Sequence, residues 1–175
     1  MINDTPERYG TVTRFLHWLM AILVVWQLLK LGDRINEGEH WVGQTLVPWH
    51  VSVGVLILVL AVIRLIWALK QRPQRPKHVG SRTILIKGGH FLLYAVMILL
   101  PITGSLYLLG NGYGVTFFGI ELIAKPEGET PWMATVGALH SPLAWILLVL
   151  VIGHIGAALY HHFIERDDTL KRIAG

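Results

Sequence analysis

The stretch HSPLAWILLVLVIGHIGAALYHHFI, residues 140–164, decides the fold of this chain. It contains no Asp, Glu, Lys or Arg, and at roughly 20 residues per crossing it is long enough to span a bilayer as one α-helix. It also carries His140, His154, His161 and His162. Ionisable side chains inside a membrane are costly and usually functional. The stretch therefore predicts a membrane-spanning helix that brings imidazoles into the bilayer.

Three further apolar segments precede this one. The shortest, residues 15–29, lies between Arg14 and Lys30, so its helix must extend past both ends, with these two side chains reaching the interface. Gln27, Lys30 and Asp33 stand where a signal peptide would need small residues for cleavage, which indicates a retained anchor. The expected spans cover about residues 13–33, 48–70, 84–109 and 134–164. The sequence thus predicts an all-α fold, an integral membrane four-helix bundle that forms one domain over residues 1–175.

The composition excludes several other classes of protein. Of the 175 residues, 53% are hydrophobic and only 15% are charged, whereas a soluble domain carries about 25% charged residues. The chain has no cysteine, which excludes disulfides, cysteine-bound zinc, iron–sulfur clusters and haem attached through thioethers. Any metal must therefore be held by nitrogen or oxygen ligands. The formal charge of +4 does not indicate a nucleic-acid partner, because the basic residues flank the expected spans.

The distribution of lysine and arginine predicts the orientation, because basic residues near span ends stay on the cytoplasmic side. The tails and the loop between spans two and three carry most of them: Arg8, Arg14, Lys70, Arg72, Arg75, Lys77, Arg82, Lys87, Arg166, Lys171 and Arg172. The other two loops hold only Lys30, Arg34 and Lys125, against Asp33, Glu37, Glu39, Glu121, Glu127 and Glu129. Both termini are therefore expected in the cytoplasm.

This orientation assigns a depth to each intramembrane histidine. His17 and His90 enter near the cytoplasmic face, and His50 and His140 enter near the outer face. His154 follows His140 by 14 residues, which places it about 21 Å deeper on the same helix and about 40° out of register. Both imidazoles then point into the bundle at opposite depths.

Two stacked b-type haems, each held between two histidines of a four-helix bundle, fit this pattern. For the outer haem the histidines are His140 and His50, and for the inner haem they are His154 with either His17 or His90. The alternatives are hydrogen bonding between helices and a zinc site. Zinc ligands would gather at one depth, preferably with carboxylates, and the apolar segments that form the spans contain no Asp or Glu. The pattern therefore favours haem.

Several short motifs resemble the bacterial cytochrome b561 family. They are RFLHWL at residues 14–19, WHVSVG at residues 49–54, Gly89-His90 with Pro101 and Gly104 downstream, and His140 with His154, His161 and His162. The resemblance covers almost the whole chain. It implies a di-haem, four-helix protein of the bacterial inner membrane, with His17 paired with His154 and His50 with His140. At least one stand-alone member of this family acts as a superoxide oxidase that reduces ubiquinone.

Other polar residues fall near the inner haem level. His161 lies two turns beyond His154, nearly on the same helical face, where it can donate to a quinone carbonyl or a haem propionate. Arg64 follows His50 by 14 residues and would need a propionate or quinone oxygen to compensate its charge. The alternative for Arg64 is a side chain that reaches the cytoplasmic headgroups.

The cytoplasmic side of the third span supplies the remaining candidates. His90 is a candidate for the quinone neighbourhood, although a histidine that only bonds a neighbouring helix is an equal alternative. Lys77, Arg82 and Lys87 are candidates for contacts to quinone or propionate, but a cytoplasmic loop is basic in any case.

These assignments predict a membrane di-haem b-type cytochrome that moves electrons from an outer-side donor to ubiquinone at the cytoplasmic side. The first candidate donor is superoxide, which would make the chain a superoxide:ubiquinone oxidoreductase. The outer loops carry a formal charge of −3, which does not favour an anionic donor. The alternative is a non-catalytic electron-transfer subunit that docks a periplasmic redox protein.

Overall fold

The computed structural model describes residues 1–35, 41–76 and 83–175, and in this part of the chain four helical segments are long and apolar enough to cross a membrane. These segments are Thr11–Leu31, Val47–Gln74, Thr83–Gly110 and Pro131–Glu165. The helices behind the first three are α1 (Thr11–Ile35), α3 (His50–Gln71) and α4 (Thr83–Gly110). The predicted class, a membrane protein built on four spanning helices, is confirmed.

Each spanning helix packs on the next: α1 on α3, α3 on α4, and α4 on α6 (His140–Tyr160). The buried core lies where these neighbours meet and includes Met20, Val53, Ile57, Ala61 and Met97. The outward faces remain apolar and exposed, as expected for helices in contact with lipid.

The fourth spanning segment consists of several pieces. α5 (Pro131–Gly137) leads into α6 (His140–Tyr160), which continues into one π-helical turn (His161–Glu165) and then the short α7 (Thr169–Ala174). α5 packs closely against the end of α4, because glycines stand at the contact points. A Cβ on Gly110 would clash with the Ala134 backbone, and a Cβ on Gly137 would clash with the Tyr107 backbone. This contact fixes where α6, and therefore His140, begins.

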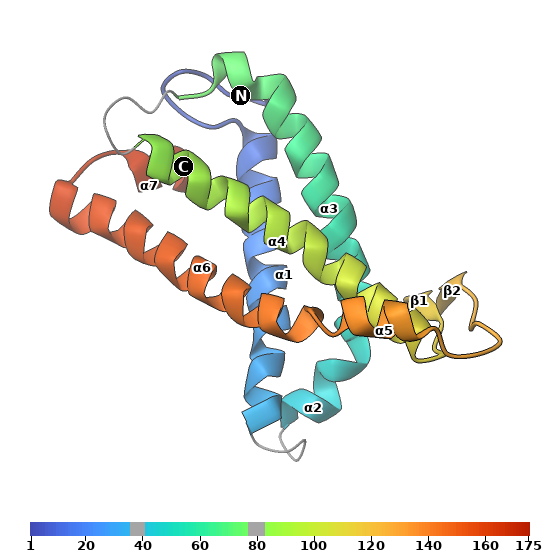
Figure 1. The fold of residues 1–175 in the computed structure, drawn as a ribbon. Coiled ribbons are helices and arrows are strands. Elements are labelled where there is room, and N and C mark those ends of the chain that lie inside the picture. The colour runs from blue at the N-terminus through green and yellow to red at the C-terminus, as the bar shows by residue number, and fades with distance from the viewer. Residues whose placement is uncertain (36–40, 77–82) are drawn as a thin grey trace.

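A small hairpin adds a non-helical element at the end of the molecule where α4 finishes (Figure 1). Strands β1 (Val115–Phe117) and β2 (Ile120–Ile123) are antiparallel, and Phe118 and Gly119 between them both have positive φ. Two consecutive positive φ angles define the turn type that matches strand twist, but they strain a phenylalanine. The Phe118 backbone N–H donates to the Ser52 hydroxyl (2.9 Å), which fastens the hairpin to α3. The short α2 (Trp41–Thr45) and a 3-10 turn (Val47–Trp49) precede α3.

The opposite end of the molecule gathers both termini (Figure 1). Buried Asp4 pairs with Arg75 beyond the end of α3 (2.8 Å) and accepts a hydrogen bond from the Gly10 N–H. The Tyr9 N–H donates to the Arg172 carbonyl, and the Trp18 indole N–H donates to the Ile173 carbonyl. These bonds tie the N-terminal segment, α3 and α7 together on one side of the spanning region.

Candidate functional site: paired histidines at two depths

The outer site consists of His50 and His140, which are the first residues of α3 and α6. Their ring centroids are 5.8 Å apart. His140 Nδ1 donates to the Leu100 carbonyl (2.8 Å), which leaves Nε2 deprotonated and suited to bind a metal. His50 Nδ1 is buried and has no hydrogen-bond partner.

A glycine makes the position of His140 possible. A Cβ added to Gly104, one turn after Leu100, would lie 3.0 Å from both Cε1 and Nδ1 of the His140 ring. The ring therefore packs directly on the α4 backbone. Sequence reasoning used Gly104 only as part of a motif and missed this role. The sequence gives no signal for it, because every residue has a backbone carbonyl and a glycine four residues later is not distinctive.

The inner site brings three imidazoles together. His154 of α6 lies between His17 of α1 and His90 of α4, with ring-centroid distances of 6.1 Å to His17 and 5.5 Å to His90. Both partners that the sequence left open are thus within reach of His154.

The hydrogen bonds of these two rings differ. His90 Nδ1 donates to the Ile86 carbonyl of its own helix (2.8 Å), which leaves Nε2 deprotonated. His17 Nδ1 instead accepts from the Arg64 guanidinium (2.8 Å), since arginine can only donate. A neutral His17 in this contact carries its proton on Nε2, so binding a metal through Nε2 requires Arg64 to release Nδ1.

Arg64 is a half-buried residue of α3 that contacts α1 and α4. Its guanidinium contacts His17 and lies 5.6 Å from the centroid of the Tyr94 ring. Among the described residues it forms no ion pair with a carboxylate. Its location agrees with a role beside an anionic group at the inner level, because an uncompensated cation in a bilayer is costly.

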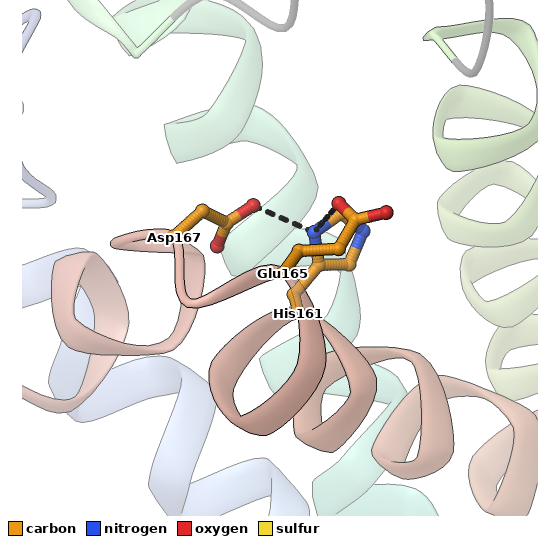
Figure 2. A group of neighbouring side chains, drawn as sticks. All are labelled: His161, Glu165 and Asp167. Atoms are coloured by element: carbon orange, nitrogen blue, oxygen red, sulfur yellow. Dashed lines mark hydrogen bonds and ion pairs between the residues drawn. The ribbon is translucent and has the colours of Figure 1, made fainter.

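His161 is held by two carboxylates at the end of the fourth spanning segment, as Figure 2 shows. Its Nδ1 lies 2.6 Å from Asp167 Oδ2 and 3.1 Å from Glu165 Oε2. Burial would raise the pKa of Asp167, but hydrogen bonds from Thr169 and His161 outweigh it and lower the pKa below its ordinary value. Sequence reasoning found His161 and missed both acids, because the chain reversal that returns Asp167 is a tertiary feature.

Of the three remaining candidates, the structure describes only Lys87, near the beginning of α4. Lys87 is exposed there. Lys77 and Arg82 lie outside the described residues. The structure therefore brings His17, His90, His154 and Arg64 together. His161 lies seven residues beyond His154, where α6 passes into the π-helical turn.

The histidine pairs fit the geometry of a metal held from two sides. An imidazole nitrogen binds a transition metal at about 2 Å, so two rings on opposite sides of one iron have centroids roughly 6 Å apart. The pairs join α6 to α1 and to α3, helices that otherwise make few contacts with α6. Beside His154, a Cβ added to Gly153 or Gly156 would meet no atom within 4 Å. Both glycines are exposed, so the helix beside His154 is open at these two positions.

Four apolar spanning helices with facing imidazoles have the arrangement of a membrane protein that binds a metal cofactor between its helices. A family model for prokaryotic cytochrome b561 matches residues 8–175, and the chain belongs to this family. The family implies b-type haem and electron transfer in a multi-pass bacterial membrane protein.

Individual relatives align over nearly their whole length. Cytochrome b561 homolog 2 of Escherichia coli K12 is 33% identical, over 99% of this chain and 94% of that protein. The probable superoxide oxidase CybB of Yersinia pestis is 29% identical, over 95% of this chain and 96% of that protein. Cytochrome b562 of Cereibacter sphaeroides is 25% identical, over 90% and 89% of the two chains.

Proposed function

We propose that the chain holds two b haems and moves electrons from a donor at the outer side of the bacterial inner membrane to ubiquinone at the cytoplasmic side. The observation that carries this proposal is the pairing of imidazoles at two depths, with centroids 5.8 Å apart for His50 and His140 and 6.1 Å apart for His17 and His154. A haem held by such a histidine pair would supply one-electron redox chemistry.

The protein supplies orientation and a dry core. The Leu100 carbonyl fixes the tautomer of His140, and apolar residues such as Val53, Ile57 and Met97 exclude water between the two levels. Arg64 supplies positive charge at the inner level, beside His17. This positive charge would favour an added electron at the inner level.

The overall reaction balances with superoxide as the donor. Two superoxide ions lose one electron each and leave as dioxygen, and ubiquinone gains two electrons and two protons to become ubiquinol. His161, His90 and the basic residues Lys77, Arg82 and Lys87 are the proposed surroundings of the quinone. The relative from Yersinia pestis, described as a probable superoxide oxidase, supports this choice of donor.

The haem content of the purified protein tests the proposal. A pyridine haemochrome assay should give two non-covalent b haems per chain, with low-spin spectra that indicate two axial histidines. One haem per chain, or none, would reject the di-haem proposal.

A second candidate function is favoured by the charge of the outer surface. Glu121, Glu127 and Glu129 are exposed on and after the hairpin, and Lys125 is the basic residue among them. An acidic surface repels a small anion and attracts a basic protein. In this alternative the chain is a non-catalytic electron-transfer subunit that docks a periplasmic redox protein.

The two functions differ in how the haems are reduced. As an oxidase, the isolated protein should be reduced by superoxide within milliseconds without a partner, and ubiquinone should reoxidise it. As a subunit, it should be reduced slowly by superoxide, with a rate that rises with salt as the acidic surface is screened.

A further inference from the structure

We propose that Asp167 and Glu165 hold His161 as the proton donor to the quinone and connect it to the cytoplasmic solvent. This inference rests on the proposed function, since it concerns the protons that ubiquinone takes up when it is reduced. Figure 2 shows the three side chains turned toward one another.

The local backbone is arranged to bring Asp167 back to His161. The π-helical turn ends at Glu165, and Arg166 adopts a left-handed conformation with φ of 53° that reverses the chain. The Asp167 N–H then donates to the His161 carbonyl (3.1 Å). A left-handed conformation is unfavourable for arginine and is kept only where the surrounding contacts require it.

Each oxygen of Asp167 has its own partner. Oδ1 accepts from the Thr169 N–H at the start of α7 (2.8 Å), and Oδ2 lies 2.6 Å from His161 Nδ1. The bond to α7 fixes the carboxylate, so Oδ2 stays directed at the imidazole. The Nδ1–H of His161 is thereby used, and Nε2 is the nitrogen that can donate to a substrate.

When His161 donates through Nε2, its Nδ1–H remains bonded to Asp167, so the ring that delivers a proton carries hydrogen on both nitrogens. The reduced pKa of Asp167 keeps its carboxylate ionised at neutral pH, so it does not compete for that proton.

Exposure increases from the imidazole outward. The His161 side chain is 19% exposed, Glu165 is 29% exposed and Asp167 is 39% exposed. The pair of acids therefore lies between His161 and water. In each proton transfer the Nε2–H bond breaks and an O–H bond forms on the reduced quinone, and a solvent proton then restores the ring. Two such transfers, with two electrons from the haems, complete ubiquinol.

Other charged groups on neighbouring elements define the control. On α7, Lys171 and Arg172 lie within one turn of Asp167's partner Thr169, and Asp168 pairs with Lys171 (3.0 Å). On α4, Lys87 and His90 are the titratable groups closest to the beginning of the helix, which is expected at the cytoplasmic side. Asp168 is the matched control, because D168N removes the same charge one residue away from Asp167 without touching His161.

The test compares two acceptors for the dithionite-reduced holoprotein in nanodiscs, with EDTA present. Ubiquinone-1 needs protons and ferricyanide does not. D167N and H161Q should slow reoxidation by ubiquinone-1 by roughly tenfold or more, and E165Q should slow it less, because its contact is longer. None of the three variants should change reoxidation by ferricyanide, and D168N should behave like the unmodified protein with both acceptors.

The pH profile separates proton delivery from a structural effect. The ubiquinone-1 rate of D167N should depend on pH differently from that of the unmodified protein, because His161 has lost the carboxylate that accepts its Nδ1–H. An unchanged profile and rate in D167N, or equal slowing with both acceptors, would overturn the inference while the proposed function stands. If the unmodified protein is reoxidised by ferricyanide but not by ubiquinone-1, the proposed function fails and this inference fails with it.

Discussion

Among single residues, the choice of partner for His154 has the largest consequence. His90 lies slightly closer to it and already has a deprotonated Nε2, whereas His17 is bonded to Arg64. The resemblance to the family nevertheless implies His17. The geometry of the site accommodates both partners, so the ligand set has to be tested by removing each ring.

Alanine substitution should identify the axial ligands. H17A and H154A should each lower the haem content from two per chain to one, and H50A and H140A should do the same for the outer haem, because a single remaining histidine binds haem weakly. H90A should keep both haems. The measurement is pyridine haemochrome content with redox titration of the remaining haem. Loss of the inner haem in H90A with both haems retained in H17A would show that His90 is the ligand.

Gly104 should be specifically required at the outer site. In G104A the new Cβ would press on the His140 ring at 3.0 Å, so the ring must shift and weaken its bond to the Leu100 carbonyl. We expect a changed potential or partial loss of the outer haem alone, with a cost of about 1 kcal/mol for the hydrogen bond. G88A is the control on the same helix, because a Cβ there meets no atom within 4 Å. Equal effects of G104A and G88A on the outer haem would contradict this role.

Among the elements, the outer hairpin depends on one long-range hydrogen bond. Phe118 keeps its strained φ of 47° where its N–H donates to Ser52 and its ring lies 6.0 Å from that of Trp49. Both contacts are within one turn of His50. The hairpin is thus attached to the same end of α3 that presents the outer ligand.

S52A should loosen the hairpin without disturbing the helices. Loss of the acceptor leaves the Phe118 N–H unpaired, at a cost of about 1 kcal/mol. Amide hydrogen exchange in residues 115–123 should become roughly fivefold faster, and the core of α3 should be unaffected. S105A is the control, because its hydroxyl bonds only to the Pro101 carbonyl of its own helix. Unchanged exchange in the hairpin of S52A would show that the bond does not hold it.

The link between the π-helical turn and α7 should depend on pH. The folded protein lowers the pKa of Asp167 below its ordinary value of 3.8. The ionised carboxylate therefore contributes stability above pH 3.8, and this contribution is lost as pH falls through the lowered pKa. Amide exchange in residues 166–174, corrected for intrinsic rates, should become faster over that acidic range. In D167N it should be fast at neutral pH already, and an acid-induced change of the same size in D167N would contradict the assignment.

At the scale of the whole molecule, the structure brings the N-terminal segment, the end of α3 and α7 to one side of the spanning region. The hairpin and α2 lie away from this side (Figure 1). Which side faces the cytoplasm is predicted from the basic residues, and a reporter tests it. Alkaline phosphatase fused after Gly175 should be inactive, and a fluorescent protein at the same point should be active.

Insertion of the same reporters after Glu127 provides the reciprocal control, since this loop is expected outside. Phosphatase should then be active and fluorescence absent. Active phosphatase after Gly175 would invert the orientation and place the proposed quinone side outside the cell.

The sequence by itself determined the class of the protein and the depth of its histidines. Apolar length and the absence of charge in residues 140–164 require a spanning helix, and a rise of 1.5 Å per residue places His140 and His154 at different levels. These conclusions use only local periodicity and the cost of charge in lipid. The pairing of Val115–Phe117 with Ile120–Ile123 did not follow from the sequence, because Phe-Gly is not a usual hairpin turn.

Only the tertiary structure decided which groups meet across helices. The bond from His140 to Leu100, the contact of Arg64 with His17 and the return of Asp167 to His161 join residues that no helical spacing relates. They depend on how α6 leans against α4 at Gly104 and on the left-handed Arg166, which reverses the chain after the π-helical turn. Helix rotation and chain reversal result from packing many side chains at once, so one segment read alone does not contain them.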